Sequence, residues 1–86
     1  MITLRHIEIY KTYQGDGDGF VRCATAEEAH IMKYNEWAFI DNMMQDFKLI
    51  KGGYASQTYV KAINEKLQEN CDSEETIQAL KAIADL

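Results

Sequence analysis

The chain has 86 residues, of which 47% are hydrophobic and 10% aromatic, so we expect a single globular domain over residues 1–86. Its formal net charge of −5 argues against binding to nucleic acid, because phosphate backbones are bound by clustered lysine and arginine. No apolar run is long enough to cross a membrane and the N-terminus lacks the pattern of a secretory signal, so we expect a cytoplasmic protein. A chain this short leaves much of its surface exposed, and a homodimer is therefore kept as an alternative to a monomer.

Residues 2–13 are predicted to form a helix. Thr3 can cap it, and Leu4 belongs to a set of apolar positions at helical spacing. Ile2 and Ile7 would then occupy the two places of a hydrophobic staple. The segment is also rich in β-branched and aromatic residues, which favour a strand. Strict alternation fails, however, and no partner strand is evident, so a helix is the better prediction.

Residues 14–20 are the most informative stretch of the sequence. Three of the five glycines alternate here with Asp16 and Asp18, in a chain that contains no proline. Glycine tolerates positive φ and interrupts regular elements, so the stretch predicts a sharp break with two exposed carboxylates. The short apolar run that follows, residues 20–24, is expected to dock this loop onto the core.

A divalent metal ion is one ligand that the loop could hold. Asp16 and Asp18 lie at the spacing found near the start of an EF-hand loop, which needs oxygen ligands at positions 1, 3, 5 and 12 and a glycine at 6. With Gly19 at position 6, positions 1 and 12 are Gln14 and Thr25. An EF-hand has carboxylates at these two positions, so the pattern does not match there. A weak, irregular Ca²⁺ or Mg²⁺ contact remains an alternative to a turn in which the aspartates bond nearby N–H groups. No phosphate-binding fingerprint surrounds the glycines, and no cofactor is expected.

Capping residues and apolar periodicity predict two helices after the loop. Thr25 and Glu28 form a capping box ahead of a short helix that ends near Lys33, and Asn35 can cap the next helix. Gly52 and the glycine after it supply the left-handed end of that second helix. Its buried stripe is expected to comprise Trp37, Ile40, Met43 or Met44, Phe47 and Ile50.

Two more helices complete the predicted fold. Ser56 caps one of them, and Asp72–Glu75 forms a break and a further capping box before the last. Their buried stripes are expected to be Tyr59, Val60, Ile63, Leu67 and Cys71, followed by Ile77, Leu80, Ile83 and Ala84. The sequence thus predicts an all-α fold, a compact bundle of four to five short helices with a Gly/Asp-rich loop after the first.

No set of residues in the sequence indicates catalysis. His6 and His30 are the groups expected to titrate near neutral pH, but neither has a recognisable nucleophile or acid beside it, and both are expected on the surface. Cys23 and Cys71 lie far apart and are expected to be reduced thiols. We therefore do not expect an enzyme.

The candidate partner-binding residues are Tyr13, Asp16, Asp18, Phe20 and Arg22. Tyrosines beside an acidic loop are typical of protein-binding faces, and an arginine can either close the loop through a salt bridge or face the partner. We therefore predict a non-enzymatic interaction module that binds a protein with a basic surface. The alternative is a regulatory protein that binds Ca²⁺ or Mg²⁺ through the two aspartates.

In length, acidity and predicted helix count, the chain resembles the colicin immunity proteins, small antitoxins that bind nuclease toxins. This resemblance implies inhibition of a toxin or another effector as the most concrete form of the predicted function. The acidic–aromatic specificity motif of that family is not reproduced in this sequence, so no residue roles are carried over.

Overall fold

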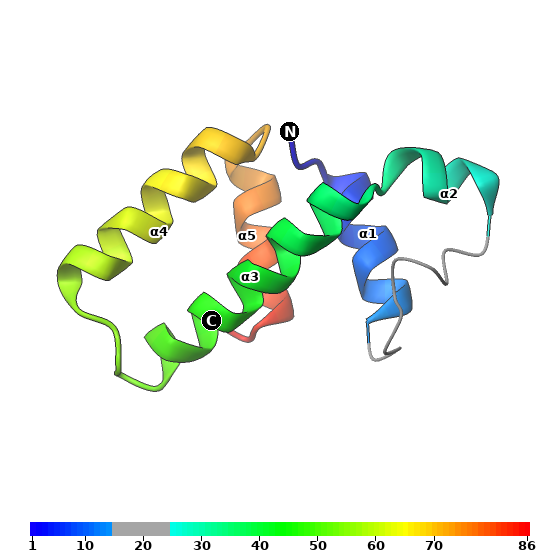
Figure 1. Ribbon diagram of the computed structural model, residues 1–86. Helices are drawn as coiled ribbons and strands as arrows, with labels where there is room; N and C mark the ends of the chain where they lie inside the picture. Colours follow the sequence, from blue (N-terminus) through cyan, green and yellow to red (C-terminus); the bar gives the residue numbers. More distant parts are fainter. Residues whose placement is uncertain (15–24) are drawn as a thin grey trace.

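The computed structural model describes residues 1–14 and 25–86, and these form five α-helices without a strand (Figure 1). The helices are α1 (Leu4–Tyr13), α2 (Ala26–Ile31), α3 (Tyr34–Lys51), α4 (Gln57–Asn70) and α5 (Glu74–Ile83). The predicted all-α bundle is confirmed, and the first segment is a helix. The Gly/Asp-rich loop predicted after it lies outside the described residues.

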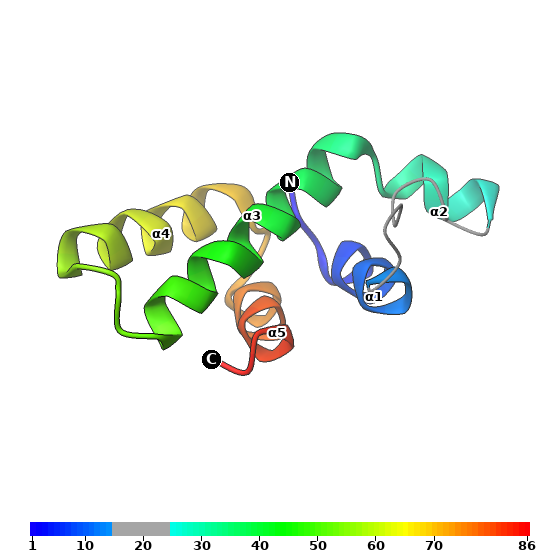
Figure 2. The ribbon, with the colours of Figure 1, turned by 60° about the horizontal axis from the view of Figure 1, so that its bottom comes forward.

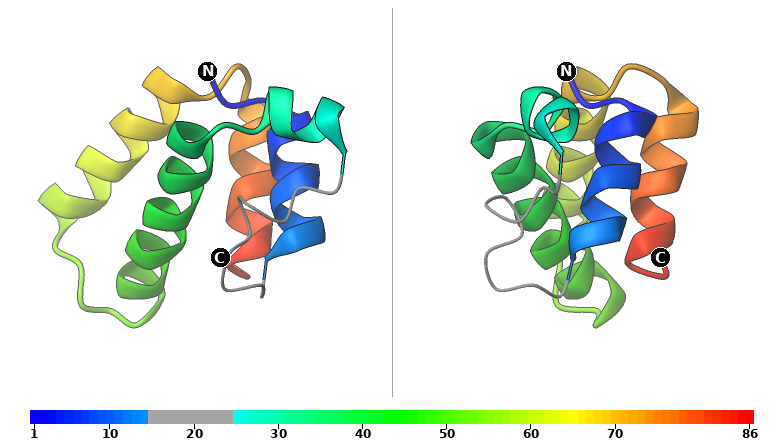
Figure 3. Two further views of the ribbon diagram at one scale, coloured as in Figure 1. Left: turned by 45° about the vertical axis from the view of Figure 1, so that its right-hand side comes forward. Right: turned by 90° about the vertical axis from the view of Figure 1, so that its right-hand side faces the viewer.

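The helices pack in a simple arrangement around α3. Helices α1 and α5 lie side by side and run in the same direction, as both views of Figure 3 show. Helix α4 returns antiparallel to α3 on one side, and the short α2 lies beyond α1 on the other (Figure 2). Helix α1 contacts α2, α3 and α5, so it occupies a central place in the bundle.

A backbone pairing at the start of the chain sets the direction of α1. The N–H of Ile2 donates to the carbonyl of Asn70 at 2.6 Å, and the N–H of Asp72 donates to the carbonyl of Ile2 at 3.0 Å. Ile2 and Cys71 thereby form an isolated parallel bridge, and both side chains are buried. Because the bridge precedes both α1 and α5, the two helices start together and run in parallel.

Every helix except α2 contributes buried side chains to the core. Helix α2 contributes only the partly buried Ile31, and the fully buried Met32 follows it directly. The predicted stripe on α3 is confirmed: Ile40, Met43 and Phe47 are buried, and Trp37 packs against them. The complete set of buried hydrophobic residues is Ile2, Ile7, Ile9, Tyr10, Met32, Ile40, Met43, Phe47, Ile63, Leu67, Cys71, Ile77 and Leu80.

The buried face of α1 differs from the predicted one. Leu4 was expected in the apolar stripe but is 37% exposed, whereas Ile9 is only 1% exposed. The buried residues of this helix are His6, Ile7, Ile9 and Tyr10. At 100° per residue these side chains share one face, and Leu4 projects from the opposite side.

The expectation that His6 is a surface residue is also wrong, although His30 is exposed as expected. His6 occupies the third position of α1, where its Nδ1 accepts the N–H of Thr3 at 3.0 Å. Its Nε2 lies 3.1 Å from the carbonyl oxygen of Ile31 at the end of α2. The ring performs the capping task that glutamate or glutamine usually performs, and it also joins α1 to α2.

Most helix ends follow the predicted signals. Thr25 and Ser56 accept hydrogen bonds from the first turns of α2 and α4, and Gly53 ends the turn after α3 with a φ of +78°. Helix α3 begins earlier than expected, with Lys33 rather than Asn35 at its N-cap. Met32, the residue just before this cap, is buried in the core, so the chain turns toward the core there and α3 begins directly after Lys33.

Helix α5 is capped by Ser73, whose hydroxyl accepts the N–H of Thr76 at 3.2 Å. The predicted box began one residue earlier, at Asp72. In the structure, the N–H of Asp72 donates to the carbonyl of Ile2, and Ser73 is the cap.

None of the helices in residues 1–14 and 25–86 is both long and apolar enough to span a membrane.

Tyr10 joins α1 to α3 through a buried phenol. Its hydroxyl donates to Oδ1 of Asp41 at 2.7 Å, and its ring packs against Trp37 with centroids 4.6 Å apart. Burial, followed by the hydrogen bond to the Asp41 carboxylate, raises the pKa of Tyr10 far above its usual range. A folded-state pKa above the unfolded value gives stability that is present below about pH 10 and is lost as the pH rises further.

The variant Tyr10→Phe removes this hydroxyl while keeping the ring. We expect it to lower the free energy of unfolding by about 1 kcal/mol at pH 7, the usual contribution of one hydrogen bond. The difference from the wild type should shrink above pH 10, because the unfolded wild type gains an ionised phenol there. Urea unfolding at pH 7 and at pH 10.5 measures both effects, with Tyr54→Phe, at an exposed tyrosine, as the control. A constant difference across this range would contradict the assignment.

Candidate functional site

The residues predicted to bind a partner belong in sequence to the end of α1 and to the connection between α1 and α2. Asp16, Asp18, Phe20 and Arg22 lie outside the described residues, so their placement is untested. Tyr13 is described and is the last residue of α1, with a half-buried side chain that packs against the core.

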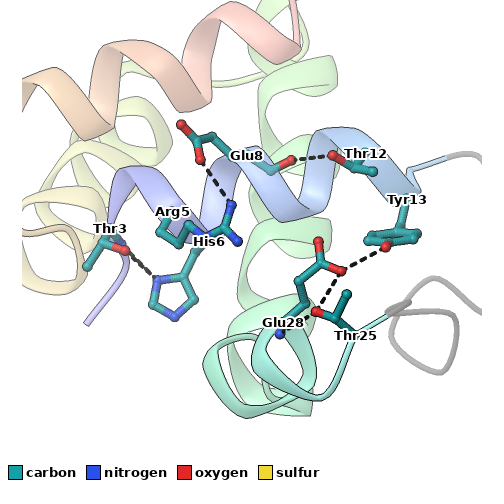
Figure 4. A network of polar contacts seen from close by, with 8 residues as sticks. All are labelled: Thr3, Arg5, His6, Glu8, Thr12, Tyr13, Thr25 and Glu28. Carbon is teal, nitrogen blue, oxygen red and sulfur yellow. Dashed lines mark hydrogen bonds and ion pairs between the residues drawn. The ribbon is translucent and has the colours of Figure 1, made fainter.

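Tyr13 joins the end of α1 to the start of α2 (Figure 4). Its hydroxyl donates to Oε1 of Glu28 at 2.9 Å, and the hydroxyl of Thr25 donates to the same oxygen at 3.1 Å. The N–H of Glu28 in turn donates to Oγ1 of Thr25 at 3.0 Å, as expected from the predicted capping box. The residues on either side of the segment 15–24 are therefore linked to each other.

Hydrogen bonding keeps Glu28 in its charged form. The hydroxyl of Tyr13 lowers the pKa of Glu28 below its ordinary value of 4.5, and the bonds from Thr25 and the charge of Arg5 act in the same direction. A carboxylate with a lowered pKa contributes stability that is present above about pH 4.5 and is lost as the pH falls below it. The link between α1 and α2 is therefore complete at neutral pH.

The outer face of α1 adds charges close to this link. Arg5 and Glu8 form an exposed ion pair at 3.3 Å, and the hydroxyl of Thr12 donates to the backbone carbonyl of Glu8 at 2.9 Å (Figure 4). An exposed pair of this kind adds little stability. The pair nevertheless places one positive and one negative charge on the exposed surface of α1.

The tyrosines divide into those that reach the surface and those that bind a carboxylate. Tyr34 and Tyr54 are 67% and 84% exposed. Tyr10, Tyr13 and Tyr59 each donate a hydroxyl to an acidic residue of another helix, namely Asp41, Glu28 and Asp46. The pairing of these three tyrosines with carboxylates was not predicted. No local pattern encodes it, because the partners lie more than ten positions apart.

The described residues offer few reactive groups. Cys71 is a free, buried thiol, and burial raises its pKa to about 11, so little thiolate exists at neutral pH. Across residues 1–14 and 25–86, no three side chains of His, Cys, Asp or Glu come together in a way that could hold a metal ion. The predicted alternative metal ligands, Asp16 and Asp18, and the second cysteine, Cys23, lie outside this part of the chain.

Comparison with known proteins places the chain in no family. No protein-family model matches it, and neither the curated proteins nor the solved structures contain a match.

The variants Tyr13→Phe and Glu28→Ala test the link between α1 and α2. Each should lower the melting temperature at pH 7, and the loss in the double variant should be smaller than the sum of the two single losses, because both single variants remove the hydrogen bond between Tyr13 and Glu28. The loss for Tyr13→Phe should become smaller as the pH falls below about 4.5 and Glu28 takes up a proton in the wild type. Thermal unfolding followed by circular dichroism measures these shifts. Fully additive losses would show that the two residues do not act together.

Proposed function

We propose that the protein is a small acidic interaction module, not an enzyme, that binds a protein partner with a basic surface. Binding is assigned to the segment that carries Asp16, Asp18, Phe20 and Arg22, with Tyr13 at its edge. A cytoplasmic location is part of this proposal.

The hydrogen bond between Tyr13 and Glu28 is the observation that supports the proposal most directly. It joins the two helices that border the segment, so the positions at which the segment leaves and re-enters the helices are fixed. Binding residues are often carried by loops that a rigid scaffold positions, because the scaffold reduces the ordering cost of binding. The acidic composition supports the choice of a basic partner, since complementary charge speeds association and selects partners.

Inhibition of a toxin or another effector is the most concrete form of this function. A small, acidic, all-helical protein can cover a basic surface of an effector without any chemistry of its own. Self-association into a homodimer remains compatible with this activity. The likeness to immunity proteins in size and charge favours this form, and it supplies no residue assignments.

The double variant Asp16→Lys, Asp18→Lys tests the proposed binding segment. It reverses two charges, so we expect loss of the complex with the natural partner, while the helical circular dichroism stays unchanged. Affinity purification of tagged wild type and variant from the native host, followed by identification of the captured proteins, is the measurement. The double variant Glu65→Lys, Glu69→Lys changes the charge equally on the exposed face of α4 and is the matched control. Unaltered capture of the same partner by the variant of the binding segment would overturn the proposal.

Titration with Ca²⁺ separates the interaction module from the alternative metal-binding protein. We expect no rise in melting temperature and no change in Trp37 fluorescence up to millimolar Ca²⁺. Trp37 is a suitable probe because it packs against Tyr10 and therefore reports on the contact between α1 and α3. A melting temperature that rises with metal concentration, and fails to rise in Asp16→Asn with Asp18→Asn, would instead establish the metal-binding function.

A further inference from the structure

A pocket lies between α1, α3 and α5, near the end of the bundle at which all three helices finish (Figure 3). Its volume is about 480 Å³, within the range of about 300–1,000 Å³ that small-molecule pockets generally have. Among the described residues, it is lined by Tyr10, Gln14, Met44, Lys48, Ile83 and Ala84. Because three helices contribute to it, the pocket exists only in the folded bundle.

The walls of the pocket are largely apolar and are held in place by the core. Met44, Ile83 and Ala84 are half-buried and pack against the buried residues. The ring of Tyr10 is fixed by the hydrogen bond of its hydroxyl to Asp41 at 2.7 Å. Walls that are already ordered lower the entropy cost of binding an apolar ligand.

Lys48 is the charged residue among the described residues that line the pocket. It is exposed, and no carboxylate of residues 1–14 and 25–86 lies within ion-pair distance of its ammonium group. Lys51, three positions further along α3, differs because its Nζ pairs with Oδ2 of Asp85 at 3.3 Å. An unpaired ammonium group beside apolar walls favours a ligand that carries a negative charge on an apolar body.

The position of Asp41 sets the orientation of such a ligand. Asp41 accepts the hydroxyl of Tyr10, so a negative charge already lies behind that wall and repels a second one. Asp41 and Lys48 are seven positions apart on α3, which is about 10 Å along the helix axis. The apolar body of the ligand would therefore lie toward Tyr10, with its charged group at Lys48.

We propose that this pocket binds a small amphipathic monocarboxylate, a carboxylic acid with a medium-length apolar chain. The carboxylate would accept hydrogen bonds from the ammonium group of Lys48, and the chain would lie against Met44 and Ile83. A cationic ligand would face Lys48 with a like charge, and a multiply charged phosphate would need more cations than the described lining supplies. This inference does not depend on the proposed contact with a protein partner.

Octanoate tests the pocket, with octanamide and acetate as matched ligands. Each is titrated into the ¹⁵N-labelled full chain at pH 7, and amide shifts are followed by NMR. We expect octanoate to bind about fivefold more tightly than octanamide, which lacks the charge, and at least about tenfold more tightly than acetate, which lacks the chain. The shifted resonances should be those of Gln14, Met44, Lys48, Ile83 and Ala84. No binding of octanoate, equal affinity for octanamide, or shifts located elsewhere would overturn the proposal.

The peptide acetyl-Gly-Leu, with a free C-terminal carboxylate, distinguishes a small molecule from the end of a protein chain. We expect it to bind more weakly than octanoate, because its amide groups would lose hydrogen bonds to water beside the apolar walls. Tighter binding of the peptide would show that the pocket is built for a chain terminus, and the assignment to a small carboxylic acid would be wrong.

A variant at the charged residue then assigns the contact. Lys48→Gln removes the charge and keeps most of the stem, so octanoate and octanamide should bind to it with equal affinity. The affinity for octanamide itself should stay within about twofold of the wild type, because the apolar walls are unchanged. Lys61→Gln, on the exposed face of α4, changes the net charge equally and is the control. A preference for octanoate that persists in Lys48→Gln would refute the role of this lysine.

Discussion

The backbone pairing of Ile2 with the connection between α4 and α5 is the constraint on which the bundle depends. Two hydrogen bonds join the start of the chain to Asn70 and Asp72, and the side chains of Ile2 and Cys71 are buried at the same point. The pairing makes α1 and α5 neighbours with a common direction. Once α1 is placed in this way, its remaining faces can reach α2 through His6 and α3 through Tyr10.

Hydrogen bonds from tyrosine to carboxylate are the second recurring feature. They join α1 to α3, α1 to α2, and α4 to α3, in each case where a partly apolar ring reaches the edge of the core. A phenol hydroxyl satisfies a carboxylate without neutralising it, as the lowered pKa of Glu28 illustrates. The bundle therefore uses acidic residues for its own packing and still presents negative charge to solvent, which suits a protein that binds a basic partner.

The segment around Asp16 and Asp18 stands out in the sequence through its composition, and the structure describes only its borders.

The local elements of this protein could be predicted from short stretches of its sequence. The cap residues Thr25 and Ser56, the glycine end of α3 and the apolar stripe of that helix act over a few positions, so their physics is contained in short stretches of chain. The buried face of α1 and the burial of His6, in contrast, follow from the packing of the whole bundle. These outcomes depend on which helices surround α1, and the pairing of Ile2 with residues some seventy positions away sets those neighbours.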